Sequence, residues 1–446
     1  MLRILVNRVY GRLFVAQVVA ILGTGLLTIA LGLTAYDLAG DQAGRVLGLA
    51  LTIKMVAYVG LSPVATALVA RLDRRRVLIA ADLVRAGAAL CLPFIDAAWQ
   101  IYALIFVLQA ASATFTPTFQ AVIPDVLPDE ADYTRALSLS RLAYDLENLI
   151  SPVLAGLLLS VMAPSWLFAG TSVGFLASAL LVLSVRLPQA SARADSPFRE
   201  RLIGGSRIYL ATPRLRGLLA LNLTVAAVGA VVIVLSVVIA RSVFGGSDRD
   251  LAVLLGAYGA GSMAVALALP RLLDHLRDRA VMMTSGAVAA GLMLAAGLGI
   301  SLMGWPAWLV LLALWALIGA AVAGIMTPSG RLLRRSAHSR DRPAVFAAQF
   351  ALSHACWLLA YPLAGFLGSA AGVGATMLTM GLVGMAGVVA ARVVWPKSAT
   401  PELEHTHADL PPEHPHLQDA VQHRGVWIHR HAFVIDDEHR VWPTSG

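Results

Sequence analysis

The chain has 446 residues, of which 58% are hydrophobic and only 13% are charged, and its mean hydropathy is +0.75. Soluble domains carry about 25% charged residues, so this composition excludes a chain that is surrounded mainly by water. The net charge of +8 does not indicate a nucleic-acid partner, because the basic residues form short clusters and no continuous stripe. The expected partner is instead the lipid bilayer.

Twelve apolar runs predict twelve transmembrane helices and therefore an all-α membrane protein, since about 20 apolar residues cross a bilayer. The predicted spans are 13–36, 46–70, 77–96, 99–120, 137–160, 165–186, 216–241, 251–270, 280–301, 306–328, 343–368 and 372–394. They divide the chain into a six-helix bundle at 1–186, a central linker at 187–214, a second six-helix bundle at 215–395 and a tail at 396–446. The first run lacks a clear cleavage site, so we interpret it as a helix and not as a signal peptide.

Arginine is distributed unequally between the two sets of loops. Loops after odd-numbered spans hold only Arg45, Arg241 and Arg249, whereas the loops after even-numbered spans and the N-terminus hold many more. Arginine-rich short loops stay in the cytoplasm. The pattern predicts a multi-pass protein of a bacterial inner membrane, with both termini and the central linker in the cytoplasm.

The two halves of the chain share three short features at nearly the same offset. They are RLDRRR at 71–76 with RLLDHLRDR at 271–279, Thr116-Pro117 with Thr327-Pro328, and SPVLAG at 151–156 with YPLAG at 361–365. The recurrence predicts two six-helix pseudo-repeats of parallel topology. In transporters built from such repeats, the substrate site lies near the membrane midplane between the halves.

From residue 1 to about residue 395 the chain resembles the major facilitator superfamily, and the resemblance implies that fold. The residues that carry it, and that it implies as a gating motif, are Asp73, Arg74, Arg75, Arg76, Asp82, Arg85, Pro152 and Gly156. In the family, an aspartate and basic residues at this place latch helix ends in one conformation. This copy lacks the leading glycine, near Ala67, and the alternative is that these residues only pack helices and cap their ends.

Two further similarities concern the direction of transport. The segment 151–156 is similar to the fifth-helix signature of antiporters, although Ala155 replaces its usual glycine. The phrase AVIPDVLPDEADYTRALSLSR at 121–141 looks like the exporter branch that includes macrolide and siderophore efflux proteins. The resemblance therefore implies an exporter.

Ionisable residues at membrane depth are candidates for function, because charge is costly in lipid. Lys54, Asp145, Glu147 and His354 all fall near the midplane of their predicted spans. Asp145 has a simpler interpretation, an ion pair with Arg141 one turn earlier. Glu147 points away from that face and is the best candidate for a proton or cation site. Lys54, His354 and Asn148, which shares the face of Asp145, are candidates to line the pathway, and the alternative for His354 is a packing residue.

The tail is rich in histidine, which is the commonest metal ligand in proteins. Eight of the 11 histidines lie there: His405, His407, His414, His416, His423, His429, His431 and His439. Three pairs have His-x-His spacing, and such tracts are typical of metal binding. The alternative is a disordered, solubilising tail. Proline-rich residues 396–415 are expected to be a linker, whereas VWIHRHAFVID at 426–436 is apolar and is expected to form a small hairpin or to dock on the membrane bundle.

An exporter with a histidine-rich cytoplasmic tail resembles the nickel-resistance branch of the superfamily. That resemblance implies a secondary transporter, a monomer without a cofactor, that exports a divalent metal cation such as Ni²⁺ or Co²⁺ in exchange for protons and confers resistance. The alternative is efflux of a drug, macrolide or siderophore-like organic solute. A metal site would need Asp, Glu, His or Cys to converge at the midplane, and an organic-cation site would need aromatic walls around one carboxylate. No phosphate loop, Gly-x-Ser-x-Gly elbow or His-Glu-x-x-His motif indicates an enzyme.

Overall fold

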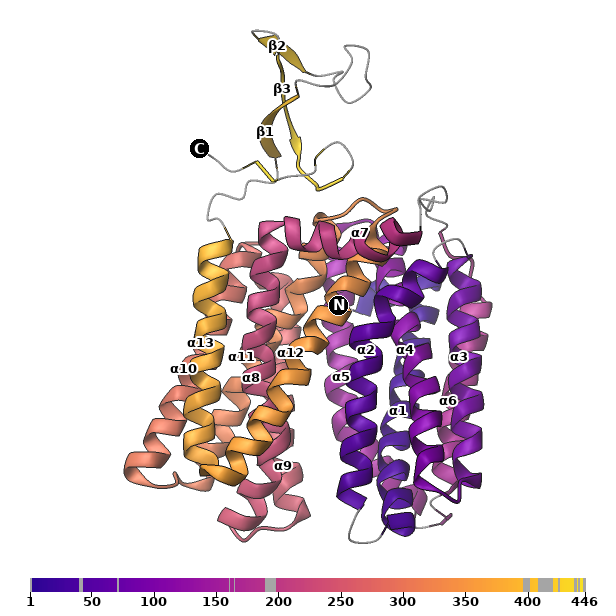
Figure 1. The fold of residues 1–446 in the computed structure, drawn as a ribbon, viewed down its shortest axis with the longest axis vertical. Helices are drawn as coiled ribbons and strands as arrows, with labels where there is room; N and C mark the ends of the chain where they lie inside the picture. Colours follow the sequence, from indigo (N-terminus) through magenta and orange to yellow (C-terminus); the bar gives the residue numbers. More distant parts are fainter. Residues whose placement is uncertain are drawn as a thin grey trace.

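Apolar helices long enough to span a bilayer make up most of the structure, which is a computed structural model (Figure 1). It describes residues 2–39, 43–69, 72–159, 161–163, 165–188, 198–395, 402–407, 420–423, 426–436, 439 and 442–443. The first half holds η1 (Leu2–Val6), α1 (Arg8–Ala39), α2 (Ala43–Val69), α3 (Arg74–Cys91), η3 (Leu92–Phe94), α4 (Ala98–Val126), α5 (Glu130–Leu159) and α6 (Ser165–Leu183). The second half holds α8 (Pro213–Val238), the π-helical turn η4 (Ile239–Val243), α9 (Asp248–Leu272), α10 (Asp278–Met303), α11 (Trp308–Arg335), α12 (Arg342–Ala370) and α13 (Gly372–Val394).

Eleven helices in the described part of the chain are long and apolar enough to cross a membrane. They confirm eleven of the predicted spans. The remaining one, α5, has 30 residues and packs between α1 and α9, but it carries many more charged side chains than its neighbours. Its role as a twelfth span therefore remains a prediction that rests on its place in the bundle.

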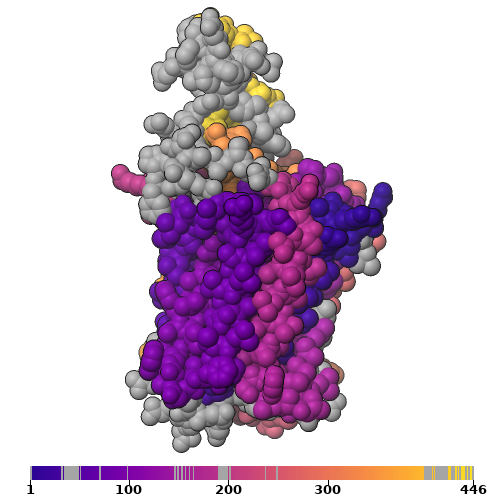
Figure 2. Space-filling view, turned by 90° about the vertical axis from the view of Figure 1, so that its right-hand side faces the viewer, coloured from indigo at the N-terminus to yellow at the C-terminus, as the bar shows by residue number. Residues whose placement is uncertain are grey.

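The two halves form two bundles that lie side by side, and they repeat the same packing (Figure 1). In the first bundle α1 packs on α6, α2 on α4 and α3 on α6, and in the second α8 packs on α13, α9 on α11 and α10 on α13. The bundles meet where α2 packs on α12 and α5 packs on α9. The repeat relates these two contacts, because α2 corresponds to α9 and α5 corresponds to α12. Figure 2 shows the packed wall of α3 and α6 on the outer side of the first bundle. The predicted pseudo-repeat is confirmed.

Small residues allow the matching helices of each bundle to approach closely. Thr171 of α6 donates a hydrogen bond of 2.8 Å to the carbonyl of Gly23 on α1. In the second bundle, Thr224 of α8 donates a hydrogen bond of 2.8 Å to the carbonyl of Gly384 on α13. A side chain at Gly23 would come within 3.1 Å of the Thr171 carbonyl. The repeat thus extends from helix order to individual contacts.

A helix that the sequence analysis did not predict lies within the central linker. Residues Phe198–Ala211 form α7, which runs across one end of the bundles and packs on α12 and α2 (Figure 1). Tyr209 is fully buried and donates a hydrogen bond of 2.5 Å to Gln349 on α12. Gly205 faces the carbonyl of Ala344 so closely that a side chain there would meet it at 2.1 Å. The linker is therefore partly folded, because a few apolar residues give it a face to bury.

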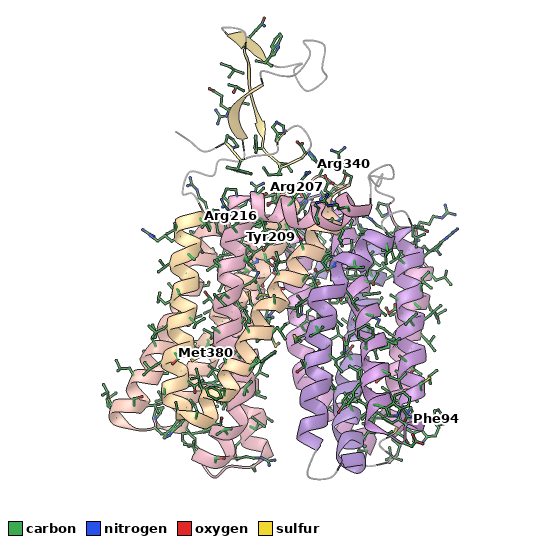
Figure 3. The ribbon with its side chains drawn as sticks, in the orientation of Figure 1. Phe94, Arg207, Tyr209, Arg216, Arg340 and Met380 are labelled. Carbon is green, nitrogen blue, oxygen red and sulfur yellow. The ribbon has the colours of Figure 1, made fainter. Side chains whose placement is uncertain are left out.

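Arginine marks the end of the molecule at which α7 lies. Figure 3 shows Arg207, Arg216 and Arg340 at this end, whereas Phe94 lies at the opposite end. The tail follows α13 at the same end (Figure 1). The arginine-rich loops and the tail thus lie at one end, and the cytoplasmic location of that end stays a prediction from the positive-inside rule. We call this end the tail end.

The tail contains a three-stranded antiparallel sheet in the order β1-β3-β2. Its strands are β1 (Glu402–His407), β2 (Val421–His423) and β3 (Val426–Ala432). The prediction of a linker over 396–415 was wrong at Glu402–His407, because β3 supplies a pairing partner for that segment. The prediction of a hairpin or a docked segment over 426–436 is confirmed in both forms.

The segment that follows β3 docks on the second bundle. Phe433 is 2% exposed and Ile435 is fully buried, and both join the apolar core that the second bundle contributes. Asp436 accepts a hydrogen bond of 3.2 Å from His338 and one of 2.7 Å from the backbone of His439. Partial burial opposes ionisation of Asp436, but these hydrogen bonds outweigh it and hold the pKa of its carboxyl well below the usual range.

Candidate functional site

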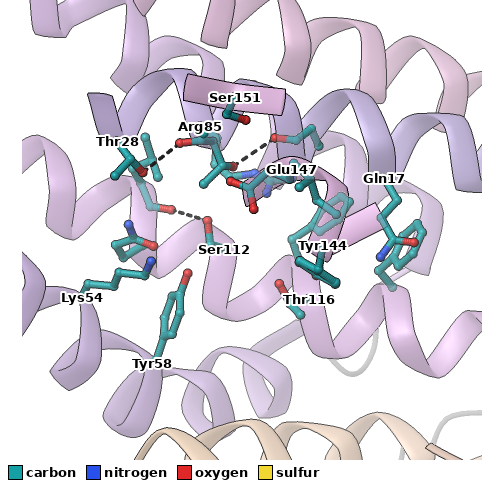
Figure 4. A pocket seen from close by; sticks show the side chains of 18 of the residues that line it. Gln17, Thr28, Lys54, Tyr58, Arg85, Ser112, Thr116, Tyr144, Glu147 and Ser151 are labelled. Carbon is teal, nitrogen blue, oxygen red and sulfur yellow. Dashed lines mark hydrogen bonds between the residues drawn. The ribbon is translucent and has the colours of Figure 1, made fainter. Parts of the chain in front are cut away.

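A cavity of about 470 Å³ lies in the first bundle, between α1, α2, α3, α4 and α5 (Figure 4). Four aromatic side chains line it: Tyr58, Phe115, Phe119 and Tyr144. Amides and hydroxyls from α1, α4 and α5 also reach it, among them Gln17, Gln109, Thr28, Ser112 and Ser151. Its charged lining residues, in the part of the chain described, are Lys54, Arg85 and Glu147.

Glu147 of α5 and Lys54 of α2 face the same cavity. The two are close enough for their opposite charges to attract. Gly25 of α1 makes room for Glu147, because a side chain there would lie 3.0 Å from its Oε1 and 2.0 Å from Ser151 Oγ. The Lys54 Nζ atom lies 5.7 Å from the ring centre of Tyr58. The structure therefore brings together two of the predicted pathway residues, and Lys54 is the partner that the sequence did not identify for Glu147.

Arg85 reaches the cavity from α3. It is 5% exposed and forms an ion pair with Asp82, which is fully buried one turn earlier on the same helix. Its guanidinium carbon lies 4.1 Å from the ring centre of Phe115 and 4.5 Å from that of Phe175. Both residues were predicted as part of the gating motif, but the pair lies inside the first bundle and lines or adjoins the cavity.

His354 of α12 packs against α2 at the interface of the two bundles. Its Nδ1 donates a hydrogen bond of 2.7 Å to the Phe350 carbonyl. Its ring lies 4.8 Å from that of Tyr58 and 4.2 Å from that of Phe350. It is not among the residues that line the described cavity, so its contacts resemble those of a packing residue that supports Tyr58.

The other predicted residues on α5 are placed only in part. The side chains of Asp145, Asn148 and Pro152, and the surroundings of Gly156, lie outside the described residues. Arg141, the alternative partner of Asp145, donates a hydrogen bond of 3.0 Å to Ser262 on α9 of the second bundle.

The cluster at the start of α3 binds helix ends within the first bundle. Asp73 caps α3 by accepting a hydrogen bond of 3.1 Å from the Arg75 backbone, and Arg76 lies 4.0 Å from Asp73 and is largely exposed. Arg75 donates to carbonyls at the end of α6. Arg74 forms an ion pair of 2.7 Å with Asp125 at the end of α4. These contacts are compatible with the alternative of capping and packing, and the gating role of the cluster stays a prediction.

Ion pairs that the sequence analysis missed join the two bundles at the tail end. Asp125, besides Arg74, pairs with Arg342 at the start of α12. Glu130 at the start of α5 pairs with Arg331 at 2.8 Å and with Arg335 on α11. The sequence analysis counted the arginines of the second bundle only toward sidedness. It placed their partners, Asp125 and Glu130, in the loop between the fourth and fifth predicted spans. The helix ends that these ion pairs join lie close together at the tail end. Figure 1 shows the helices of the two bundles diverging toward the opposite end.

Among the tail histidines, the structure describes the side chain of His439 alone. His439 is 5% exposed and its Nδ1 lies 3.0 Å from Asp436. The side chains of His405, His407, His414, His416, His423, His429 and His431 lie outside the described residues. Backbone pairing places His405 opposite His429 on neighbouring strands. Across the side chains that are described, no group of three or more His, Cys, Asp or Glu is placed to hold a metal ion.

Two similar helix bundles, the first of which holds a polar and aromatic cavity, form an architecture that is typical of membrane transporters whose halves rearrange. The family model of the Major Facilitator Superfamily matches residues 13–296 and 218–435. The chain therefore belongs to the major facilitator superfamily, a family of transporters, and this confirms the coarse part of the predicted function.

Among curated proteins, the chain is similar to exporters. It is 26% identical over 189 residues to Macrolide efflux protein A of Streptococcus pyogenes, which covers 41% of this chain and 46% of that protein. It is 26% identical over 362 residues to the Multidrug efflux pump Tap of Mycolicibacterium fortuitum, covering 75% of this chain and 85% of that protein. The match to the macrolide efflux protein spans less than half of that protein's length.

Solved structures of low sequence identity share the fold. The human organic anion transporter TETRAN has a TM-score of 0.70 at 13% identity, covering 86% of this chain and 99% of that one. A bacterial homologue of the iron transporter ferroportin, in an outward-facing state, has a TM-score of 0.70 at 14% identity, covering 86% of this chain and 98% of that one. These likenesses establish the architecture and leave the solute to be argued from the cavity.

Proposed function

We propose that this transporter exports an aromatic organic solute from the bacterial cytoplasm in exchange for protons. The observation that carries the proposal is the lining of the cavity. Four aromatic rings and one described carboxylate, Glu147, line the same cavity, and these are the groups that an organic cation requires. Aromatic faces attract a desolvated cation by about 0.5 to 2 kcal/mol, and a carboxylate at membrane depth adds a full charge.

Glu147 is the residue to which we assign the proton. A carboxylate that shares a polar and aromatic cavity with Lys54 can hold either a proton or a cationic group of the solute, but not both. Competition for one carboxylate couples the two movements, because each released proton frees the site for solute. The similarity to macrolide and multidrug exporters supports the outward direction.

Export of a divalent metal, predicted from the histidine-rich tail, remains the second candidate. It is supported by the pairing of β1 with β3 in the tail, because this pairing places His405 opposite His429. It is disfavoured at the membrane, since the described residues there include no cluster of metal ligands.

The two candidates predict opposite results in one growth experiment. The chain is expressed in a bacterium that lacks its own efflux pumps, and growth is measured on macrolides, aromatic dyes, nickel, cobalt and zinc. Our proposal expects protection against macrolides or dyes, and loss of that protection in Glu147→Gln at equal membrane expression. Protection against metals alone would contradict it. A variant that lacks residues 400–446 then separates the tail from the membrane part, because only metal export should depend on it.

A further inference from the structure

Arg85 is a buried cationic residue of the cavity to which the proposed export mechanism gives no task. Asp82 occupies one side of its guanidinium, and the rings of Phe115 and Phe175 lie 4.1 and 4.5 Å from the guanidinium carbon. The group is therefore fixed in position before any solute arrives. Its Nε atom is buried and has no hydrogen-bond partner in the part of the chain described.

A buried N–H group such as Arg85 Nε is expected to have a hydrogen-bond acceptor. Buried polar atoms are nearly always hydrogen-bonded, and a charged donor left without a partner is the most costly case. Ser151 Oγ, on α5, is likewise buried without a partner in the described structure. Both residues line the cavity. The two residues with unsatisfied atoms thus border the space that a solute would fill.

We propose that Arg85 binds an anionic group, such as a carboxylate, on the exported solute. A guanidinium presents donors in a planar fork that matches a carboxylate, and aromatic faces hold that plane in place. Asp82 balances the charge of Arg85 while the cavity is empty, which allows the arginine to stay buried.

The inference names the substrate class of the cavity, and it rests on the proposed function. Glu147 takes the positive group of the solute, Arg85 takes the negative group, and the aromatic rings hold the body between them. The preferred substrate is therefore an aromatic zwitterion. Lys54 faces the same cavity as Glu147, and we assign the anion site to Arg85 and not to Lys54.

Two dyes that differ in a single charge test this assignment. Rhodamine B carries a free carboxylate beside its cationic ring system, and its methyl ester lacks the negative charge. Binding of each is measured by fluorescence anisotropy on the purified full-length protein. Because a hydrogen bond to a charged group is worth about 1.5 to 3 kcal/mol, which is about tenfold or more in affinity, the acid should bind at least about tenfold tighter than the ester.

The variants remove the arginine without leaving a lone buried charge. The double variant Asp82→Asn with Arg85→Gln should bring the ratio of the two affinities close to one, and Arg85→Lys should keep part of the preference. The matched control is Asp132→Asn with Arg135→Gln, which removes another ion pair of the same spacing, at 2.6 Å on α5, away from the cavity lining. It should keep the wild-type ratio.

Each other outcome overturns the inference in a recognisable way. Equal binding of acid and ester by the wild type would refute the anion site and leave the proposed function intact. Loss of the preference in Lys54→Gln, but not in the Asp82/Arg85 double variant, would move the site to Lys54. If neither dye binds and no organic solute is exported in the growth experiment, the proposed function fails and the inference fails with it.

Discussion

The ion pair between Asp125 and Arg342 should hold the bundles together at the tail end. Asp125 receives Arg74 from its own bundle at 2.7 Å and Arg342 from the other bundle. Their side chains are only 11%, 12% and 17% exposed, so solvent screens them little. Asp125→Ala removes one charge-assisted bond between the bundles, which is worth about 1.5 to 3 kcal/mol. The ratio of molecules whose bundles are closed at the tail end to molecules whose bundles are open there should fall about 10- to 100-fold.

A distance between two spin labels measures this shift. Labels go on two exposed positions, Arg76→Cys in the first turn of α3 and His275→Cys in the loop before α10, after both native cysteines are changed to serine. Pulsed electron resonance should show a longer-distance population in Asp125→Ala. Arg342→Ala should do the same, and the double variant should add little to either, because both changes break one bond.

The matched control is Asp132→Ala, whose carboxylate pairs with Arg135 on its own helix. It should leave the distance distribution as in the wild type. Fully additive effects of Asp125→Ala and Arg342→Ala, or an unchanged distribution in both, would refute the reasoning that this pair holds the tail end closed.

Three further predictions concern the cavity and the tail. Glu147→Gln should abolish the dependence of solute transport on a pH gradient while aromatic solutes still bind, as measured by flux and by anisotropy. Phe433→Ala should weaken docking of the tail by about 3 to 5 kcal/mol, and hydrogen exchange over 426–436 should then lose protection while the membrane helices keep theirs. The pKa of Asp436 is depressed in the docked tail, so its contribution is present above the ordinary carboxyl pKa of about 4 and is lost as the pH falls below it. Tryptophan fluorescence from Trp442 should therefore report docking that persists from neutral pH to about pH 4 and weakens in stronger acid, and weakening already near pH 6 would contradict this.

The membrane fold could be predicted because it depends on features that repeat along the chain. Apolar runs fix the helices, since unpaired backbone groups are not tolerated in lipid, and the paired motifs at 71–76 and 271–279 reveal the repeat. The exception is α7, whose 14 residues are too few and too polar to stand out. Its folding depends on contacts such as Tyr209 with Gln349, which join positions far apart in sequence.

The candidate site could be predicted only where a single residue is unusual in its surroundings. Glu147 and Lys54 stand out because charge is rare at that depth. Their sharing of one cavity depends on how α2 and α5 are turned, and the sequence does not state this. Arg85 was placed in a gating motif by resemblance, because the sequence does not show that its side chain points into the bundle. The tail strand Glu402–His407 escaped prediction because its partner lies about twenty residues further on.

The central claim is that the cavity carries an organic solute and exchanges it for protons. Proteoliposomes that contain the purified chain, with a pH gradient across the membrane, allow an aromatic dye and radioactive nickel to be followed side by side. The account predicts gradient-driven accumulation of the dye that is absent in Glu147→Gln, without accumulation of nickel. Gradient-driven accumulation of nickel without the dye would contradict it.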